Sequence, residues 1–262
     1  MIKAVFLDVD GTVFSHRTNS IPPSAVKAVS EIQKRGIMVF AATGRHPWEI
    51  GNMNMKMFEP DGWLYMNGAC CKDSEGIYYA VPCEQNDLET VVSAMEELHF
   101  PCQLLTEDMI WINMVNEFVV DEQAAVHTPV PPERDPREVI KEPVYMMIPL
   151  VHEDIWETVF SKTEHLKYTR WTDLSADVFH ESADKAEGIR KTLQRYHLGR
   201  HEVIAVGDGP NDLCMKEACG SFAAMGNALD EVKEKADYVT DDIDCDGLYK
   251  AFVHYGLLED RL

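Results

Sequence analysis

The feature that most constrains the fold is an alternation of buried strands and amphipathic helices at the N-terminal end of the chain. Short apolar runs alternate with a helical pattern that opens with two prolines and ends in a glycine, as helices often do. Strands joined by crossover helices pair in parallel. The predicted elements are strands at 2–9, 37–44 and 62–69 and helices at 22–36 and 47–58. This end therefore predicts βαβ units in a parallel sheet.

The C-terminal end repeats the alternation. The predicted strands lie at 202–209, 220–227 and 237–240, and the predicted helices at 184–199, 210–219, 228–236 and 245–256. Because both ends follow one pattern, we expect them to form one sheet.

The middle of the chain has a different pattern, with a proline-rich and irregular stretch at 128–143. Its predicted helices lie at 88–100, 115–127 and 153–162, and its predicted strands at 109–114, 144–151, 166–172 and 176–181. The chain is therefore predicted to be an α/β protein in which a Rossmann-like parallel-sheet core, residues 1–81 and 183–262, carries an inserted α/β domain at 82–182.

Composition excludes several classes of protein. The 262 residues carry a formal net charge of −21 and no run of Lys or Arg, which argues against a nucleic-acid partner. The N-terminus lacks the pattern of a signal peptide, and no apolar stretch reaches the roughly 18 residues that a membrane helix needs. Seven scattered cysteines suit reduced thiols. We expect a cytoplasmic protein with neither a nucleic-acid nor a membrane partner.

Two pairs of carboxylates follow predicted strands. Asp8 and Asp10 end the first strand in "DVDGT", and Asp208 and Asp212 lie in the glycine turn "GDGPND". Like charges held this close call for a cation, and oxygen ligands suit Mg²⁺. The first pair alone could also be a structural acidic turn. A calcium loop at "DVDGT" does not fit, because its first and last ligand positions would fall on an apolar and a basic residue. A dinucleotide-binding turn at "GDGPND" does not fit either, because Asp212 stands in place of its third glycine.

Two further stretches could bind an anion. In "AATGR" the Thr43 hydroxyl, the Gly44 turn and Arg45 could contact a phosphoryl group, although a plain strand-end turn is the simpler reading. Lys185 stands near a predicted helix start, where a cation gains nothing from the helix dipole. Such a lysine is usually solvated, yet an anion site would use it.

Taken in order, "DVDGT", "ATGR", Lys185 and "GDGPND" resemble the haloacid dehalogenase-like phosphohydrolase superfamily, in its Cof-like branch with a large α/β cap. The stretches "NGA" at 67–69 and "AMGNALDEVKEKADYVT" at 224–240 are similar to that branch as well. The resemblance spans both ends of the chain. It implies that the inserted domain is a cap that selects the substrate.

The resemblance also implies roles for individual residues. Asp8 would attack phosphorus and form an aspartyl-phosphate, while Asp10 would protonate the leaving oxygen and later deprotonate water. The implied phosphoryl-binding residues are Thr43, Gly44, Arg45, Lys185 and Asn211. The implied Mg²⁺ ligands are Asp8, the backbone carbonyl of Asp10, Asp208 and Asp212.

The function that follows is a Mg²⁺-dependent phosphatase acting on a small phosphorylated metabolite, with a sugar phosphate as the expected choice. Two alternatives remain open from the sequence. A phosphomutase would use Asp8 and Asp10 but return the phosphoryl group to a substrate, and a regulator would bind a metabolite without catalysis.

Overall fold

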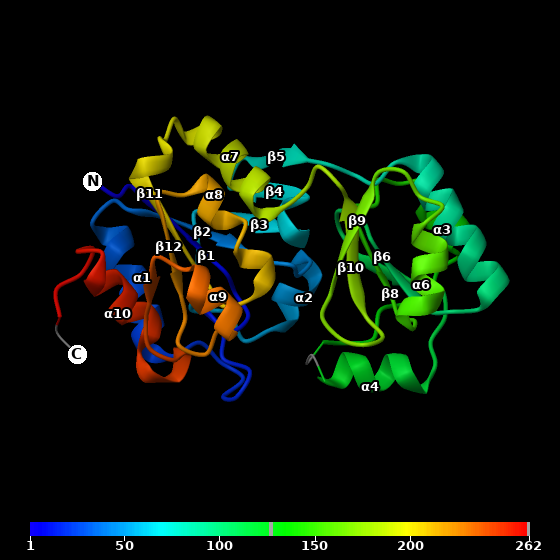
Figure 1. The fold of residues 1–262 in the computed structure, drawn as a ribbon, viewed down its shortest axis with the longest axis horizontal. Coiled ribbons are helices and arrows are strands. Elements are labelled where there is room, and N and C mark those ends of the chain that lie inside the picture. Colours follow the sequence, from blue (N-terminus) through cyan, green and yellow to red (C-terminus); the bar gives the residue numbers. More distant parts are fainter. Residues whose placement is uncertain (126–127, 261–262) are drawn as a thin grey trace. The chain divides into compact units, whose positions relative to one another are not determined.

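The computed structural model describes residues 1–125 and 128–260, and the chain divides into two compact units (Figure 1). We call them the core unit and the inserted unit. The core unit comprises Met1–Thr43, Asn54–Tyr79 and Asp184–Leu262, and the inserted unit comprises Gly44–Met53 and Ala80–Ala183. The short segment Gly44–Met53 groups with the inserted unit although the sequence analysis placed it in the core. The role of 82–182 as a substrate-selecting cap stays a prediction.

The core unit is built on one eight-stranded sheet. Its strands run in the order β13-β12-β11-β1-β2-β3-β4-β5, with β13 to β3 parallel and β4 antiparallel to β3. The strand bounds are β1 (Ala4–Leu7), β2 (Met38–Ala42), β3 (Gly62–Tyr65), β4 (Cys70–Asp73), β5 (Gly76–Ala80), β11 (Val203–Gly207), β12 (Ser221–Ala224) and β13 (Tyr238–Val239). The predicted α/β class with a parallel core sheet is confirmed.

Helices bury both faces of this sheet. Phe6 of β1 stacks on Phe40 of β2, with ring centroids 5.1 Å apart, in an apolar cluster that includes Ile189. Because strand side chains alternate, Val5 and Leu7 point to the opposite face, and both are fully buried. The helices are α1 (Pro23–Lys34), α7 (Lys185–Tyr196), α8 (Met215–Ala218), α9 (Asp230–Lys235) and α10 (Gly247–His254). Short 3₁₀ turns are η1 (Met66–Gly68), η2 (Arg200–Glu202), η3 (Pro210–Asp212) and η4 (Ile243–Cys245).

The inserted unit has an antiparallel five-stranded sheet in the order β7-β6-β8-β10-β9. Its strands are β6 (Cys102–Leu105), β7 (Ile110–Ile112), β8 (Met146–Pro149), β9 (Leu166–Arg170) and β10 (Ala176–His180). Its helices are α2 (Pro47–Asn52), α3 (Gln85–Leu98), α4 (Glu117–Ala125), α5 (Pro136–Val139) and α6 (Glu153–Phe160). Helices α3 and α6 lie together on one side of this sheet (Figure 1), and Trp156 of α6 is fully buried in the apolar cluster that they share with it.

Several predicted elements differ from the structure. The helix predicted at 47–58 ends at Asn52, because Met53 is extended (φ −85°, ψ 159°) after a Gly-Asn pair with low helix propensity. The helix predicted at 210–219 is split into η3 and α8. Strands β4, β5 and β6 were not predicted. Residues 126–127, the end of the helix predicted at 115–127, lie outside the described residues.

The structure also bears on the expectations about membrane helices and cysteines. Across residues 1–125 and 128–260, no helix has both the length and the apolarity needed to cross a membrane. The seven cysteines are free thiols, and five of them are buried.

Candidate active site

The candidate site lies at the carboxyl edge of the core sheet. Strand β1 pairs in parallel with β11 on one side and β2 on the other, so the carboxyl ends of these three strands meet. Asp8, Thr43 and Asp208 each directly follow one of them. The edge of an open parallel sheet where the strand order reverses is the usual place for a ligand.

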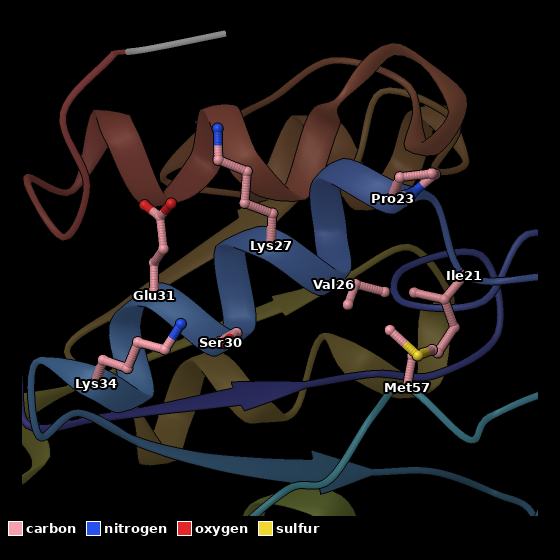
Figure 2. A pocket seen from close by; sticks show the side chains of 8 residues that line it. All are labelled: Ile21, Pro23, Val26, Lys27, Ser30, Glu31, Lys34 and Met57. Carbon is pink, nitrogen blue, oxygen red and sulfur yellow. The ribbon is translucent and has the colours of Figure 1, made fainter.

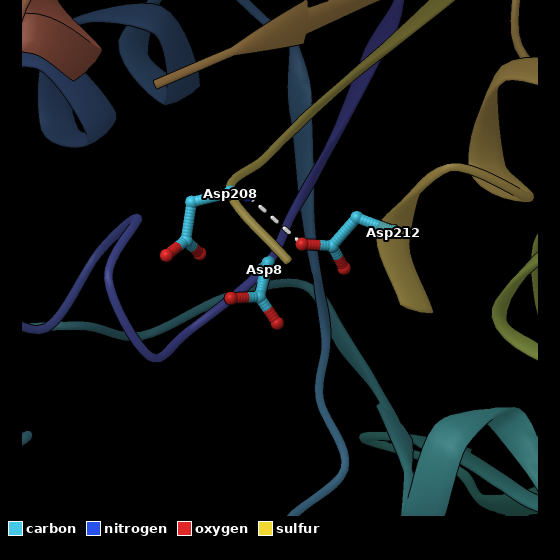
Figure 3. Close-up of side chains that lie close together, drawn as sticks. All are labelled: Asp8, Asp208 and Asp212. Carbon is cyan, nitrogen blue, oxygen red and sulfur yellow. Dashed lines mark hydrogen bonds between the residues drawn. The ribbon is translucent and has the colours of Figure 1, made fainter. Parts of the chain in front are cut away.

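Three carboxylates converge at this edge (Figure 3). One oxygen from each of Asp8, Asp208 and Asp212 lies within 4.8 Å of the others. The first and last of these side chains are buried, and that of Asp208 is partly buried. The Asp212 Oδ2 atom accepts hydrogen bonds of 2.9 Å from the backbone N–H groups of Asp208 and Gly209. These bonds fix the glycine turn around its own carboxylate.

Lys185 supplies a cation to the cluster. Its Nζ atom lies 2.6 Å from Asp8 Oδ1 and 2.6 Å from Asp212 Oδ1, and the side chain is only 1% exposed. Lys185 is the first residue of α7, and the start of this helix lies against the turn at 67–69. Only glycine fits at Gly68, which has φ +84°, because a Cβ there would lie 2.3 Å from the Asp184 carbonyl oxygen. The lysine is therefore a buried ion-pair partner, not a solvated side chain.

The charges in the cluster do not balance. Burial and the repulsion from Asp212 raise the pKa of Asp8 well above its ordinary value, against the lowering effect of Lys185. Burial and the same repulsion raise the pKa of Asp208 to about 7. For Lys185, burial lowers the pKa, but attraction to Asp212 and Asp8 outweighs it and keeps the amine protonated. With three carboxyl groups beside one ammonium, the raised pKa values of Asp8 and Asp208 mean that protons are held there unless a further cation offsets their charge.

Asp10 lies on the loop that follows β1. Its charge contributes to the raised pKa values of Asp8 and Asp208. His16 Nε2 lies 2.8 Å from Asp10 Oδ1, and the Thr12 hydroxyl donates a 3.2 Å hydrogen bond to Asp208 Oδ1. Neither Thr12 nor His16 is among the predicted site residues. Thr12 belongs to the "DVDGT" motif, whereas no periodicity or motif in the sequence indicated His16.

The other predicted phosphoryl-binding residues fall into two groups. Thr43 is fully buried in the core unit, and Asn211 Nδ2 donates a 3.1 Å hydrogen bond to Asn67 Oδ1, a further residue that the site prediction did not include. Gly44 and Arg45 belong to the inserted unit, where the Arg45 guanidinium lies 3.9 Å from the Glu49 carboxylate. The roles predicted for these four residues stay predictions.

A separate surface groove of about 500 Å³ lies beside α1 (Figure 2). It is lined by Ile21, Pro23, Val26, Lys27, Ser30, Glu31, Lys34 and Met57. None of these lining residues is a predicted site residue, and the group of potential metal-ligating side chains found in residues 1–125 and 128–260 does not include Glu31. The groove offers no reactive group comparable to the carboxylate cluster.

Comparison with known proteins gives one family. The model of the haloacid dehalogenase-like hydrolase family matches residues 5–252. YkrA of Bacillus subtilis, provisionally named a phosphatase, is 32% identical over 258 residues, covering 98% of this chain and 99% of its own.

Solved structures agree with this match. BT1666 of Bacteroides thetaiotaomicron, a phosphatase of the same superfamily, is 32% identical with a TM-score of 0.89, covering 98% of this chain and 96% of its own. The subclass IIB sugar phosphatase BT4131 is 31% identical with a TM-score of 0.89, covering 98% of this chain and 100% of its own. The resemblance seen in the sequence is confirmed: the chain belongs to the haloacid dehalogenase-like hydrolase family and is a phosphatase.

Proposed function

We propose that this phosphatase hydrolyses a small sugar phosphate with Asp8 as the nucleophile and Mg²⁺ as the cofactor. The observation that carries the proposal is the buried cluster in which the Asp8 carboxylate lies 2.6 Å from the Lys185 ammonium beside two further carboxylates. The similarity to the sugar phosphatase BT4131 over nearly the whole chain supports the substrate class.

The donor set fits a divalent cation. A divalent cation among these carboxyl groups would favour the ionised forms of Asp8 and Asp208, and carboxylate oxygens are the ligands that Mg²⁺ prefers. Asp8, Asp208 and Asp212 would hold it, together with the backbone carbonyl of Asp10. When bound, Mg²⁺ supplies positive charge that neutralises the phosphoryl oxygens.

The chain's own residues account for the two halves of the reaction. Asp8 attacks phosphorus, so that an Asp8–phosphorus bond forms while the ester bond to the sugar oxygen breaks. Asp10 gives its proton to that leaving oxygen. Water then attacks the aspartyl-phosphate and passes its proton to Asp10, which releases inorganic phosphate and free Asp8.

Neighbouring residues bind and orient the phosphoryl group in this proposal. The Lys185 ammonium offsets the negative charge that accumulates on its oxygens, and its contact with Asp8 holds the nucleophile in place. Thr43, Gly44, Arg45 and Asn211 would donate further hydrogen bonds to the phosphate. The inserted domain would select the sugar and exclude water during the reaction.

The test is phosphate release from a panel of sugar phosphates, nucleotides and cofactor phosphates, with Mg²⁺ and with EDTA. Asp8→Asn should lower kcat by at least about a thousandfold without loss of fold, because an amide cannot serve as the nucleophile. Asp230→Asn is a matched control in the same unit, since that side chain is 97% exposed. We expect it to keep wild-type turnover.

Two results would contradict the proposal. One is Mg²⁺-dependent phosphate release by folded Asp8→Asn protein. The other is an isomeric sugar phosphate as the product without inorganic phosphate, which would indicate a phosphomutase.

A further inference from the structure

We propose that His16 is a positioning residue that holds the side chain of Asp10 for proton transfer. The inference rests on the proposed function, in which Asp10 is the acid and base of the reaction. It adds a residue that neither the motifs nor the carboxylate cluster contains.

The contact between the two side chains is direct. His16 Nε2 lies 2.8 Å from Asp10 Oδ1. Nε2 is the donor when Asp10 is ionised and also when Asp10 carries its proton on Oδ2, because Oδ1 accepts in both states. The Asp10 side chain is 31% exposed, so burial alone leaves it room to change rotamer. The bond from His16 favours one rotamer.

The loop that carries His16 is fixed at several points. Within it, the backbone N–H of Gly11 donates to the Phe14 carbonyl at 2.9 Å, and Ser15 and Ser20 exchange two backbone hydrogen bonds. The His16 ring packs edge-on against the buried ring of Phe14, with centroids 5.7 Å apart. The histidine is therefore a braced donor on a closed loop and not a freely rotating surface side chain.

The adjacent residue anchors the same loop to the rest of the core unit. Arg17 Nε lies 2.7 Å from Asp244 Oδ2 in η4, and the Ser15 hydroxyl donates to the same oxygen at 3.1 Å. Fixing the loop on both sides of His16 keeps the donor at a constant place relative to Asp10. A contact of this kind contributes little to stability, since exposed pairs rarely do, but it affects how often Asp10 is correctly oriented.

The test compares three variants with the wild type by steady-state kinetics on the best substrate of the panel. His16→Phe keeps a ring against Phe14 and removes the donor. His16→Gln places an amide N–H close to the position of Nε2. The matched control is His254→Phe, since His254 is an exposed histidine of the same unit whose ring stacks on Tyr238.

We expect His16→Phe to lower kcat about five- to tenfold with little change in KM, which corresponds to the loss of one hydrogen bond at the transition state. His16→Gln should recover most of this loss, and His254→Phe should match the wild type. Long-range ¹H–¹⁵N spectra give a second readout. The His16 Nε2 signal should shift in Asp10→Ala, because the acceptor is removed.

Failure of the inference can be told apart from failure of the proposed function. If the wild type releases phosphate, Asp8→Asn does not, and His16→Phe keeps wild-type kcat, the inference alone is overturned. An unchanged Nε2 signal in Asp10→Ala overturns it as well, whatever the activity. If the wild type releases no phosphate from any ester, the proposed function fails, and the positioning role falls with it.

Discussion

Each unit of this protein buries a polar site, and the two sites are balanced in different ways. In the inserted unit the His46 ring is fully buried and neutral: Nδ1 accepts a 3.0 Å hydrogen bond from the Trp48 backbone, and Nε2 donates one of 2.9 Å to the Thr106 carbonyl. Burial lowers the pKa of His46 to about 4, so the ring stays neutral near pH 7. Both ring nitrogens have their partner inside the protein.

The carboxylate cluster of the core unit lacks this balance. Asp8, Asp208 and Asp212 lie around the Lys185 ammonium, and burial, together with the repulsion from Asp212, raises the pKa values of Asp8 and Asp208. A buried polar group whose hydrogen-bond partners all lie within the protein needs no further ligand. A buried cluster with more acidic than basic groups is stabilised by binding a proton or a cation. The comparison therefore separates a polar site whose partners all lie within the protein from a cluster of carboxyl groups that a bound proton or cation would stabilise.

The largest expected effect is the removal of the Lys185 ammonium from the cluster. In EDTA, Lys185→Met should lower the free energy of unfolding by about 3–5 kcal/mol, because it leaves buried carboxylates unpaired. Urea unfolding measures the change. Lys191→Met on the same helix is the control: its side chain is 34% exposed and pairs with Glu187 at 3.2 Å, and we expect a loss below about 1 kcal/mol. Equal losses in the two variants would contradict the charge argument.

Mg²⁺ should have the next largest effect. A ligand that binds only the folded state at a hundredfold excess over its Kd raises the free energy of unfolding by about 2.7 kcal/mol. We expect thermal unfolding to show this stabilisation in the wild type, at constant ionic strength, and to show little of it in Asp208→Asn. His46→Asn should keep it in full. A shift of the same size in Asp208→Asn would remove Asp208 from the cation site.

Much of the core site was predictable because it depends on strand order. Buried strands that alternate with helices form a parallel sheet, and residues directly after neighbouring strands then meet at one edge, as Asp8 and Asp208 do. The burial of Lys185 was not predictable from its local sequence. It depends on carboxylates that are 177 and 27 residues away along the chain, and on the close approach of Gly68 to the helix start.

The elements missed by the sequence analysis have local physical causes. The hairpin of β4 and β5 turns at residues 74–75, and β5 begins at Gly76, whose φ of +118° suits glycine, but the two strands are short and only partly apolar. His16 is six residues after Asp10. In a strand the two side chains would share a face but lie about 20 Å apart, so only the closed loop brings them together.

The smallest expected effect tests the neutral site and depends on pH. An unfolded histidine binds its proton near pH 6.5, whereas His46 in the folded chain does so at about pH 4. Between these values the unfolded chain binds more protons, so the free energy of unfolding falls as the pH decreases, by roughly 2 kcal/mol at about pH 5.

His46→Asn keeps an acceptor for the Trp48 N–H but cannot be protonated, so it should lack this part of the pH dependence. Urea unfolding of both proteins at about pH 7.5 and about pH 5 gives the difference. Identical pH dependence in the two proteins would mean that His46 is not held neutral, and the contrast between the two buried sites would be lost.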